Sequence, residues 1–204
     1  MAGMKFTVKD VSVLVAHLPE VDRAIMLPDV VRAYENVQGV GEVIVEWGGT
    51  AGANYNRAAA RAKGSVIFMA TDDQAPQTGA IQAALDTLDV DAKVIPVNRV
   101  FRKDGEPENA NYDLLGPGVS LDWTRAPFIT METFLEVGPL EDTTWYMDLD
   151  YSDRLQLAGY RLVSCPGFCL THLEGSRAWQ EDGAADREYR RYRERAALRR
   201  SKPA

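Results

Sequence analysis

The chain has 204 residues, 46% of them hydrophobic, which is enough to bury the core of one large α/β domain and excludes a wholly disordered protein. Its 23 Lys and Arg residues stand against 30 Asp and Glu residues, and the net charge of −7 argues against a nucleic-acid partner. The 28 residues from Arg177 onward carry +4, so the remainder carries −11 and is expected to form the folded body.

Strands and helices alternate along the first hundred residues. Apolar, β-branched runs predict strands at 11–16, 42–46, 66–70 and 93–100. Apolar spacings of three and four residues, or alanine-rich composition, predict helices near 27–34, at 54–63 and near 81–88. Gly64 is expected to close the second of these helices as its C′ residue. This alternation predicts a mainly parallel sheet sandwiched by helices, within a single α/β domain.

The second half has a different pattern. Residues 101–118 are polar and rich in Gly and Pro, and a loop of that length in a compact domain usually serves a function. Helices are predicted at 130–136 and 148–158, and a strand at 162–170 precedes His172. These elements complete a domain over residues 1–176.

The tail, residues 177–204, is basic and is predicted to be helical. Its apolar stripe consists only of Tyr189, Tyr192 and Ala196, which is too thin to fold alone. We expect the tail to dock on the acidic body or on a neighbouring subunit, which leaves a homo-oligomer open. Attachment to an anionic membrane is the alternative.

Neither a membrane span nor a secretion signal is expected. The longest charge-free stretches, 74–85 and 162–173, have about 12 residues each, short of the roughly 18 that a spanning helix needs. The first ten residues lack the apolar run of a signal peptide, and two cysteines are too few for a disulfide framework. These features predict a cytoplasmic protein.

The candidate ligand site lies at the carboxyl ends of the first three strands, where ligands of parallel sheets bind. Two of these ends are acidic and one contains glycines, which indicates a polar ligand with hydroxyl groups, or a metal ion. The residues at these ends are Ala16–His17–Leu18, Glu46–Trp47–Gly48–Gly49 and Thr71–Asp72–Asp73.

Asp72 and Asp73 are the sharpest feature, because adjacent carboxylates repel each other unless a cation or hydrogen-bond donors compensate. A divalent cation that also binds substrate phosphates would compensate them. The alternative is that one of them caps the next helix or forms a turn before Pro76. His17 and His172, each near a strand end, are either ligands or structural residues.

Asp148 and Asp150 open the helix predicted at 148–158. A carboxylate at a helix N-terminus stays ionised, as a general base must. Residues two apart cannot share a helix face, so at most one of the two points into a site. The alternatives are a favourable interaction with the helix dipole and a simple pair between Asp150 and Arg154.

The order of these features over residues 9–176 resembles the family-2 glycosyltransferases, which have the GT-A fold and use nucleotide-activated sugars. Residues 56–64 match the family's N-x-G-x-x-x-A-x-G helix except at Ala58, and residues 71–73 correspond to its DxD-type motif. Residues 147–154 correspond to E-D-x-D-L-x-x-R, followed by Gly159 and Tyr160. His172 corresponds to the family's later histidine, and residues 138–141 to its G-G-F-D element.

The resemblance implies an inverting, metal-dependent transfer from a nucleotide-diphosphate sugar to a hydroxyl of a glycan, protein or small molecule. Asp148 would be the general base, with Asp150 in the same motif. Residues 101–118 and Trp123 are candidate acceptor contacts, although Trp123 is equally suited to core packing. The implied ligands of Mn²⁺ or Mg²⁺ are Asp72, Asp73 and His172. The implied nucleotide-sugar contacts are Ala16, His17, Glu46, Gly48, Asn56 and Asp72, with Asn56 bracing the loop.

Other functions remain open. The first two strand ends, at Ala16–His17–Leu18 and Glu46–Trp47–Gly48–Gly49, differ from the family pattern. A catalytically silent GT-A module that binds a nucleotide or glycan is therefore the alternative. A nucleotidyltransferase is disfavoured, because no Gly-rich phosphate loop follows the first strand.

Overall fold

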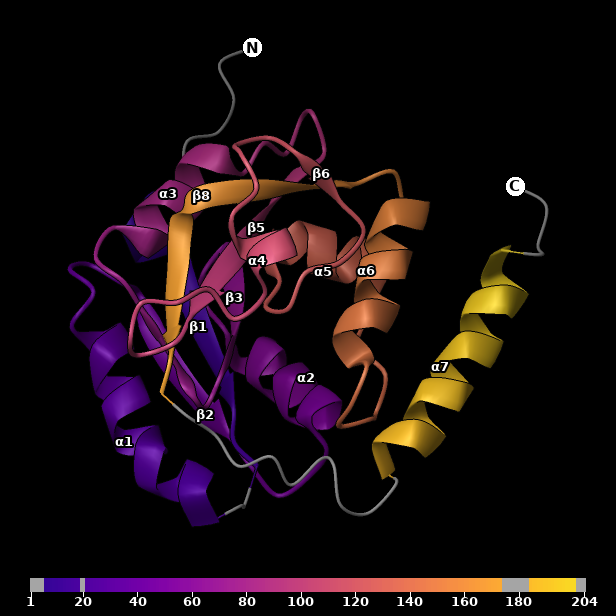
Figure 1. Cartoon of the computed structure of the whole chain (residues 1–204), viewed down its shortest axis with the longest axis horizontal. Coiled ribbons are helices and arrows are strands. Elements are labelled where there is room, and N and C mark those ends of the chain that lie inside the picture. The colour runs from indigo at the N-terminus through magenta and orange to yellow at the C-terminus, as the bar shows by residue number, and fades with distance from the viewer. Residues whose placement is uncertain (1–5, 19–20, 174–183, 201–204) are drawn as a thin grey trace.

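The computed structural model describes residues 6–18, 21–173 and 184–200. The body is built around two sheets with helices packed against them, and the C-terminal helix lies at one side (Figure 1). The first sheet has the order β2-β1-β3-β7, in which β7 alone is antiparallel to its neighbour. Its strands are β1 (Val11–Ala16), β2 (Glu42–Glu46), β3 (Val66–Thr71) and β7 (Phe128–Thr130).

The second sheet is centred on β8, which is strongly bent (Figure 1). β8 runs parallel to β5 and antiparallel to β4 and β6. Between the pairs Val97–Ser164 and Arg99–Cys169 the register shifts, so β8 bulges where it bends around the core. The strands are β4 (Gln74–Pro76), β5 (Val94–Phe101), β6 (Ser120–Leu121) and β8 (Arg161–His172).

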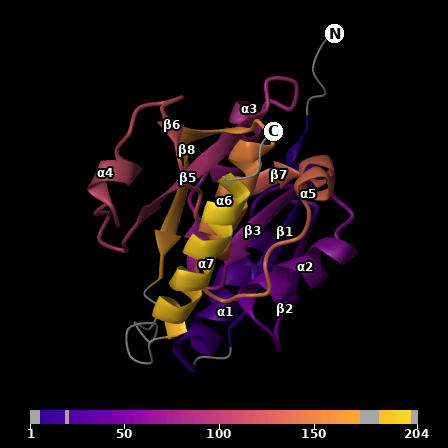
Figure 2. The ribbon, with the colours of Figure 1, turned by 90° about the vertical axis from the view of Figure 1, so that its right-hand side faces the viewer.

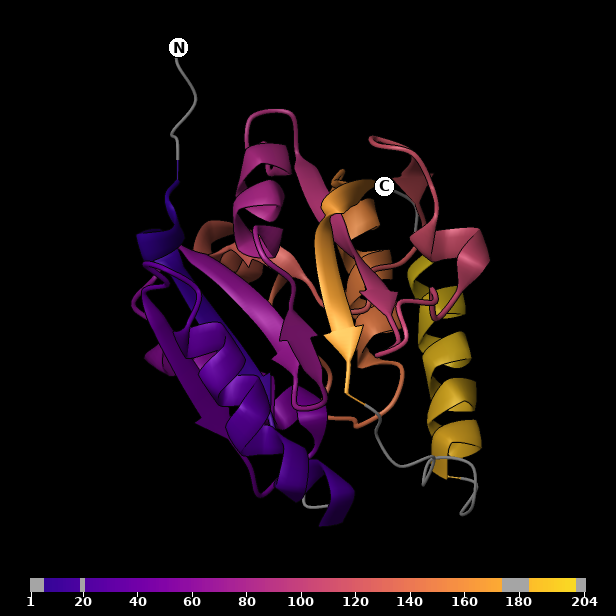
Figure 3. The same cartoon turned by 60° about the vertical axis from the view of Figure 1, so that its left-hand side comes forward.

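Helices cover both faces of the first sheet. Side chains of β1 alternate between the faces: Leu14 and Ala16 enter one core cluster, while Val13 and Val15 enter the other. α1 and α3 cover the second cluster, and α2, α5 and α6 cover the first; α1 lies across β1 and β2 in Figure 3. The helices are α1 (Val21–Glu35), α2 (Ala51–Arg61), α3 (Ala80–Thr87), α4 (Ala110–Asp113), α5 (Met131–Val137), α6 (Met147–Leu157) and α7 (Ala184–Arg200), after a 3₁₀ turn at Val8–Asp10.

The predicted helix–strand alternation and the mainly parallel sheet are confirmed. Three short strands, β4, β6 and β7, were not predicted, because two or three residues carry no readable periodicity. The predicted role of Gly64 is wrong. α2 ends at Arg61, and a Cβ at Gly64 would lie 2.5 Å from the carbonyl oxygen of Asp10. Glycine is needed there because the chain entering β3 passes close to β1.

α7 lies along the outer side of α6, as Figures 1 and 2 both show. Its Ala196 is 7% exposed, and the hydroxyl of Tyr192 donates to Asp153 on α6 at 3.1 Å. Residues 184–200 of the tail therefore pack against the body, as expected. The tail residues 177–183 and 201–204 lie outside the described part.

No helix in the described ranges combines the length and the apolar character that crossing a membrane requires.

A polar crosslink joins β1, β2 and the segment before β3. The carboxylate of Glu42 accepts hydrogen bonds from the Ser12 hydroxyl and the Lys63 amide, each at 2.6 Å. The Ser12 hydroxyl in turn accepts from the Gly64 amide at 2.8 Å. Burial raises the pKa of Glu42, but these hydrogen bonds outweigh it and hold the pKa below its ordinary value.

Glu42→Gln should therefore lower the free energy of unfolding by about 1 kcal/mol at pH 7. A depressed pKa stabilises the fold above the unfolded value of about 4.3, and that contribution disappears as the pH falls through the folded value. Urea unfolding should show the difference between wild type and variant narrowing below about pH 4. Glu35→Gln, at an exposed end of α1, is the control. A difference that stays constant with pH would contradict this account.

Candidate functional site

The carboxyl ends of β1 and β3 are joined by Asp72. This carboxylate is fully buried, and its Oδ2 lies 2.8 Å from Nδ1 of His17 and accepts from the Leu18 amide at 2.9 Å. The amide of Asn54, on α2, donates to the His17 carbonyl at 3.1 Å and to the Gly49 carbonyl at 3.3 Å. Asp72 and Asn54 thus fix the loops after β1 and β2, and Ala16 leads directly into this junction. Sequence reasoning missed Asn54, which carries no motif of its own.

The end of β2 is covered by two arginines of α2. Glu46 forms ion pairs with Arg57, at 3.5 Å, and with Arg61, and its side chain is 15% exposed. The Arg57 guanidinium also donates to the Trp47 carbonyl at 2.8 Å. Gly48 follows with φ +84° and open space where a Cβ would be. This end of the sheet therefore presents a guanidinium-paired carboxylate beside a glycine turn.

Asp73 lies next to His172 because of strand pairing. β3 and β4 are separated only by Asp72 and Asp73, and β4 pairs with β8 so that Gln74 is opposite His172. Nε2 of His172 lies 3.4 Å from Asp73, and Nδ1 lies 3.3 Å from Glu108 in the 101–118 segment. Asp73 and then Glu108 raise the pKa of His172 to about 9.

Glu108 is a candidate site residue that sequence reasoning did not single out. His172 contributes most to lowering its pKa, and Arg125 adds to this from 3.7 Å. Its only sequence signal was membership of the long polar 101–118 segment.

The predicted metal residues do not converge on one cation position. In the described part of the chain, no group of three or more His, Cys, Asp or Glu side chains is arranged to hold a metal ion. Asp72 faces the loop after β1, whereas Asp73 and His172 face each other. Asp73 offers the carboxylate oxygen that Mn²⁺ and Mg²⁺ prefer, and these ions commonly take further oxygens from substrate phosphates and water. His172 would join it as a ligand only after losing the proton that Asp73 and Glu108 stabilise.

Arg125 connects this pair to a second part of the site. Its guanidinium donates to the buried carboxylate of Asp113 at 3.0 Å and lies over the rings of Tyr112 and Trp123, at 5.5 and 5.2 Å from the ring centroids. The Trp123 ring is tilted against that of Tyr112, with the centroids 5.4 Å apart. The cluster therefore places the Trp123 indole between Arg125 and the start of α6.

Asp148 occupies the first turn of α6, and the Trp123 indole N–H donates to its Oδ2 at 2.8 Å. Its Oδ1 accepts from the Leu149 amide at 2.9 Å. Burial raises the pKa of Asp148 despite these hydrogen bonds. Burial thus outweighs the hydrogen bonds, and the raised pKa suits the carboxylate to accept a proton.

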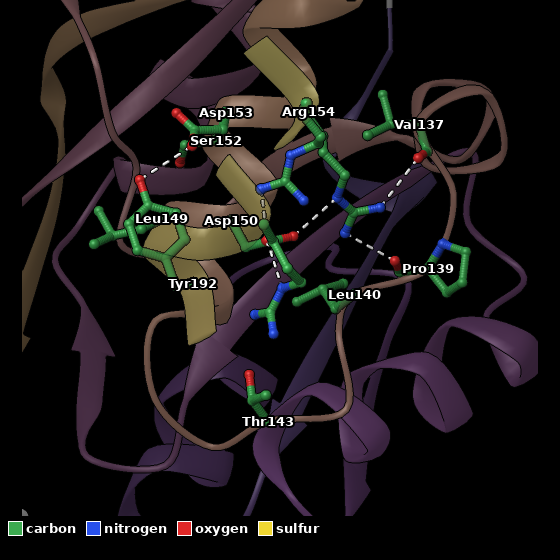
Figure 4. A network of polar contacts seen from close by, with 12 residues as sticks. Val137, Pro139, Leu140, Thr143, Leu149, Asp150, Ser152, Asp153, Arg154 and Tyr192 are labelled. Carbon is green, nitrogen blue, oxygen red and sulfur yellow. Dashed lines mark hydrogen bonds and ion pairs between the residues drawn. The ribbon is translucent and has the colours of Figure 1, made fainter. Parts of the chain in front are cut away.

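Asp150 has different surroundings, shown in Figure 4. It is fully buried, and three guanidiniums surround it: Arg154 at 3.1 Å, Arg199 at 2.7 Å and Arg195 at 3.5 Å. Arg154 also donates to the carbonyls of Val137 and Pro139. The expected pair between Asp150 and Arg154 is present, and two arginines of α7 extend it.

The loop between α5 and α6 is held against α2. The Asn56 amide donates to the Leu140 carbonyl and accepts from the Leu140 amide, both at 2.9 Å. A Cβ at Gly52 would lie 1.8 Å from the Glu141 carbonyl oxygen, so only glycine permits this approach. Asn56 thus holds a loop in place, namely the loop that leads into α6. The loop after β1 is held by Asn54 instead.

Loss of one α7 arginine should weaken the fold. Arg199→Met leaves the buried Asp150 carboxylate less compensated and should lower the free energy of unfolding by about 1–3 kcal/mol. Arg191→Met, at an exposed position of the same helix, is the matched control and should stay within about 0.5 kcal/mol of wild type. Equal effects of the two substitutions on denaturant unfolding would contradict the assignment.

Comparison with solved structures identifies the fold. A structure of GalNAc-T7 with UDP, GalNAc and Mn²⁺ superposes with a TM-score of 0.61 at 14% identity, over 90% of this chain and 47% of that one. The chain has a GT-A-like fold. S. aureus TarS gives a TM-score of 0.60 at 10% identity, over 84% of this chain and 38% of that one. A structure of TarS residues 1–349 in complex with UDP-GlcNAc gives 0.59 at 9% identity, over 81% of this chain and 59% of that one.

These neighbours are GT-A-type glycosyltransferases, so the GT-A fold implied by the sequence resemblance is confirmed. This chain therefore spans less than half of the length of each of these two proteins: 47% of the GalNAc-T7 chain and 38% of the TarS chain. No protein-family model matches the sequence, and no curated protein matches it.

Proposed function

We propose that the protein is an inverting glycosyltransferase that moves a sugar from a nucleoside-diphosphate donor to an acceptor hydroxyl. One observation carries the proposal: a continuous series of contacts runs from Asp73 and His172, through Glu108 and Arg125, to Trp123 and Asp148. A site for a departing diphosphate and a site for a base are thereby connected within one fold. The solved neighbours with UDP or UDP-GlcNAc bound support a uridine nucleotide as the first donor to test.

Asp148 is the proposed general base. Its carboxylate removes the proton from the acceptor hydroxyl as the oxygen attacks the anomeric carbon from the side opposite the diphosphate, which inverts the configuration. Its pKa is raised by burial, so its basicity is better matched to a hydroxyl than that of an exposed carboxylate. Asp150 is assigned a structural role, because its carboxylate is enclosed by three guanidiniums.

Asp73 and His172 are the proposed protein ligands of Mn²⁺ or Mg²⁺. The cation would neutralise the charge that develops on the departing diphosphate. The GalNAc-T7 structure with Mn²⁺ supports a divalent ion. Asp72 orients His17 and the loop after β1, so we assign it to the donor pocket rather than to the metal.

The donor nucleotide is proposed to bind at the ends of β1 and β2. Ala16, His17 and Gly48 would contribute backbone or ring contacts there, and Glu46 would accept hydrogen bonds from the base or the ribose. Asn54 and Asn56 would hold the surrounding loops in place. Residues 101–118 and the aromatic pair Tyr112 and Trp123 would form the acceptor side.

A catalytically silent module that binds a nucleotide or glycan is the second candidate. It is favoured by the pairing of Glu46 with Arg57 and Arg61, and by the lack of a three-ligand metal group among the described residues. Such a module would bind UDP or a UDP-sugar and would neither hydrolyse nor transfer the sugar.

Asp148→Asn should lower UDP release from UDP-GlcNAc or UDP-GalNAc at least about 100-fold and leave the Kd for UDP unchanged, because the base acts only in the transition state. Asp86→Asn, at an exposed position of α3, is the control and should retain wild-type turnover.

Asp73→Asn should instead remove the Mn²⁺-dependent part of UDP binding, measured by calorimetry. Binding without turnover in the wild type would support the silent module, whereas binding of neither a nucleotide nor a glycan would contradict both functions.

A further inference from the structure

We propose that Trp123 is a positioning residue, whose indole N–H holds and tunes the carboxylate of Asp148 as a base. The inference rests on the proposed function, and it gives Trp123 a role besides acceptor contact or core packing. Trp123 precedes β7 by a few residues, whereas Asp148 lies on α6, so only the tertiary structure brings them together. The indole nitrogen lies 2.8 Å from Oδ2, within the range of a strong charge-assisted hydrogen bond.

Both carboxylate oxygens of Asp148 are held by hydrogen bonds, and each keeps a lone pair free. The Leu149 amide at 2.9 Å and the Trp123 indole at 2.8 Å each hold one carboxylate oxygen. Each oxygen has a second lone pair, so the carboxylate can still accept an acceptor proton while its plane stays fixed. An unheld carboxylate would rotate and lose the alignment on which proton transfer depends.

The indole is itself held in place. Its ring packs against Tyr112, with the centroids 5.4 Å apart, and lies under the guanidinium of Arg125 at 5.2 Å. Arg125 is in turn anchored by the buried carboxylate of Asp113. The amide of the next residue, Thr124, donates to Ser152 on α6 at 3.0 Å, which ties the indole-bearing segment to the helix of the base. Trp123 therefore cannot move independently of Asp148.

Burial and the neighbouring donors shift the pKa of Asp148 in opposite directions. Burial raises its pKa, whereas the Trp123 and Leu149 hydrogen bonds and the charge of Arg125 lower it. Among the described residues, Tyr112 on α4 and Tyr146 before α6 also interact electrostatically with Asp148, and burial raises the pKa of both hydroxyls. Both tyrosines therefore stay neutral at physiological pH, and Trp123 is the side chain whose removal shifts the balance furthest toward protonated Asp148.

Trp123→Phe keeps the ring and removes the N–H. It should lower kcat about tenfold, leave KM for the donor within about twofold, and move the acidic limb of the pH–kcat profile upward by about one unit. The matched control is Tyr160→Phe, which also removes an aromatic donor from a carboxylate, Glu136 at 2.5 Å, but at the far end of α6. It should leave the pH profile unchanged. A lower kcat with an unshifted profile in Trp123→Phe would overturn the proposal in favour of simple packing.

A second measurement does not depend on turnover. The chain has four tryptophans, and Trp123→Phe identifies one of the four indole resonances in spectra of ¹⁵N-labelled protein. In the wild type this resonance should titrate with pH, and Asp148→Asn should abolish that titration. A titrating resonance in a protein without transfer activity would leave the positioning contact intact and count against the proposed function alone. An indole resonance insensitive to both pH and Asp148→Asn would overturn the contact itself.

Discussion

The connection between β3 and β4 determines how the rest of the site is arranged. The chain leaves the first sheet at Thr71 and enters the second at Gln74, so Asp72 and Asp73 occupy the junction between the two sheets. Asp72 is held by the loop after β1, whereas the antiparallel pairing of β4 with β8 brings His172 to Asp73. Two adjacent carboxylates are tolerated there because each has a partner of its own, His17 for Asp72 and His172 for Asp73.

The same requirement recurs wherever the body buries a negative charge. Asp113 accepts hydrogen bonds from the Val100 and Asn109 amides and pairs with Arg125, and Asp150 is surrounded by Arg154, Arg195 and Arg199. A buried carboxylate without partners costs several kcal/mol, so these contacts compensate a penalty more than they add stability. Their effect is to fix geometry: the 101–118 segment is tied to β5, and α7 is tied to α6.

The GT-A-like fold leaves the chemistry to the loops, as folds of this kind generally do. At the end of β2, Arg57 and Arg61 form ion pairs with Glu46, so the charge of this carboxylate is compensated within the protein. Next to Asp148, the Tyr112 and Trp123 rings and the Arg125 guanidinium form an aromatic cluster. These two features, more than the sheet, distinguish this site chemically.

The sequence by itself determined the elements whose periodicity is long enough to read. β-branched runs predicted β1 and β2 with their observed bounds, and the acidic start of α6 and the basic tail were predicted as helices. The GT-A fold followed from the order of motifs and not from any one of them. The carboxyl ends of the strands also indicated where polar residues would gather, because parallel strands end at one edge of a sheet.

Only the tertiary structure decided which of these residues meet. Asp148 and Asp150 both lie in the first turn of α6, yet one lies against an indole and the other against three guanidiniums, two of them from α7. Glu108, Asn54 and Trp123 carry no motif, and they enter the site through contacts between segments far apart in the chain. Gly64 was predicted from a helix-ending pattern, but it is required by a backbone crossing. Such contacts depend on packing between elements, which local sequence patterns do not encode.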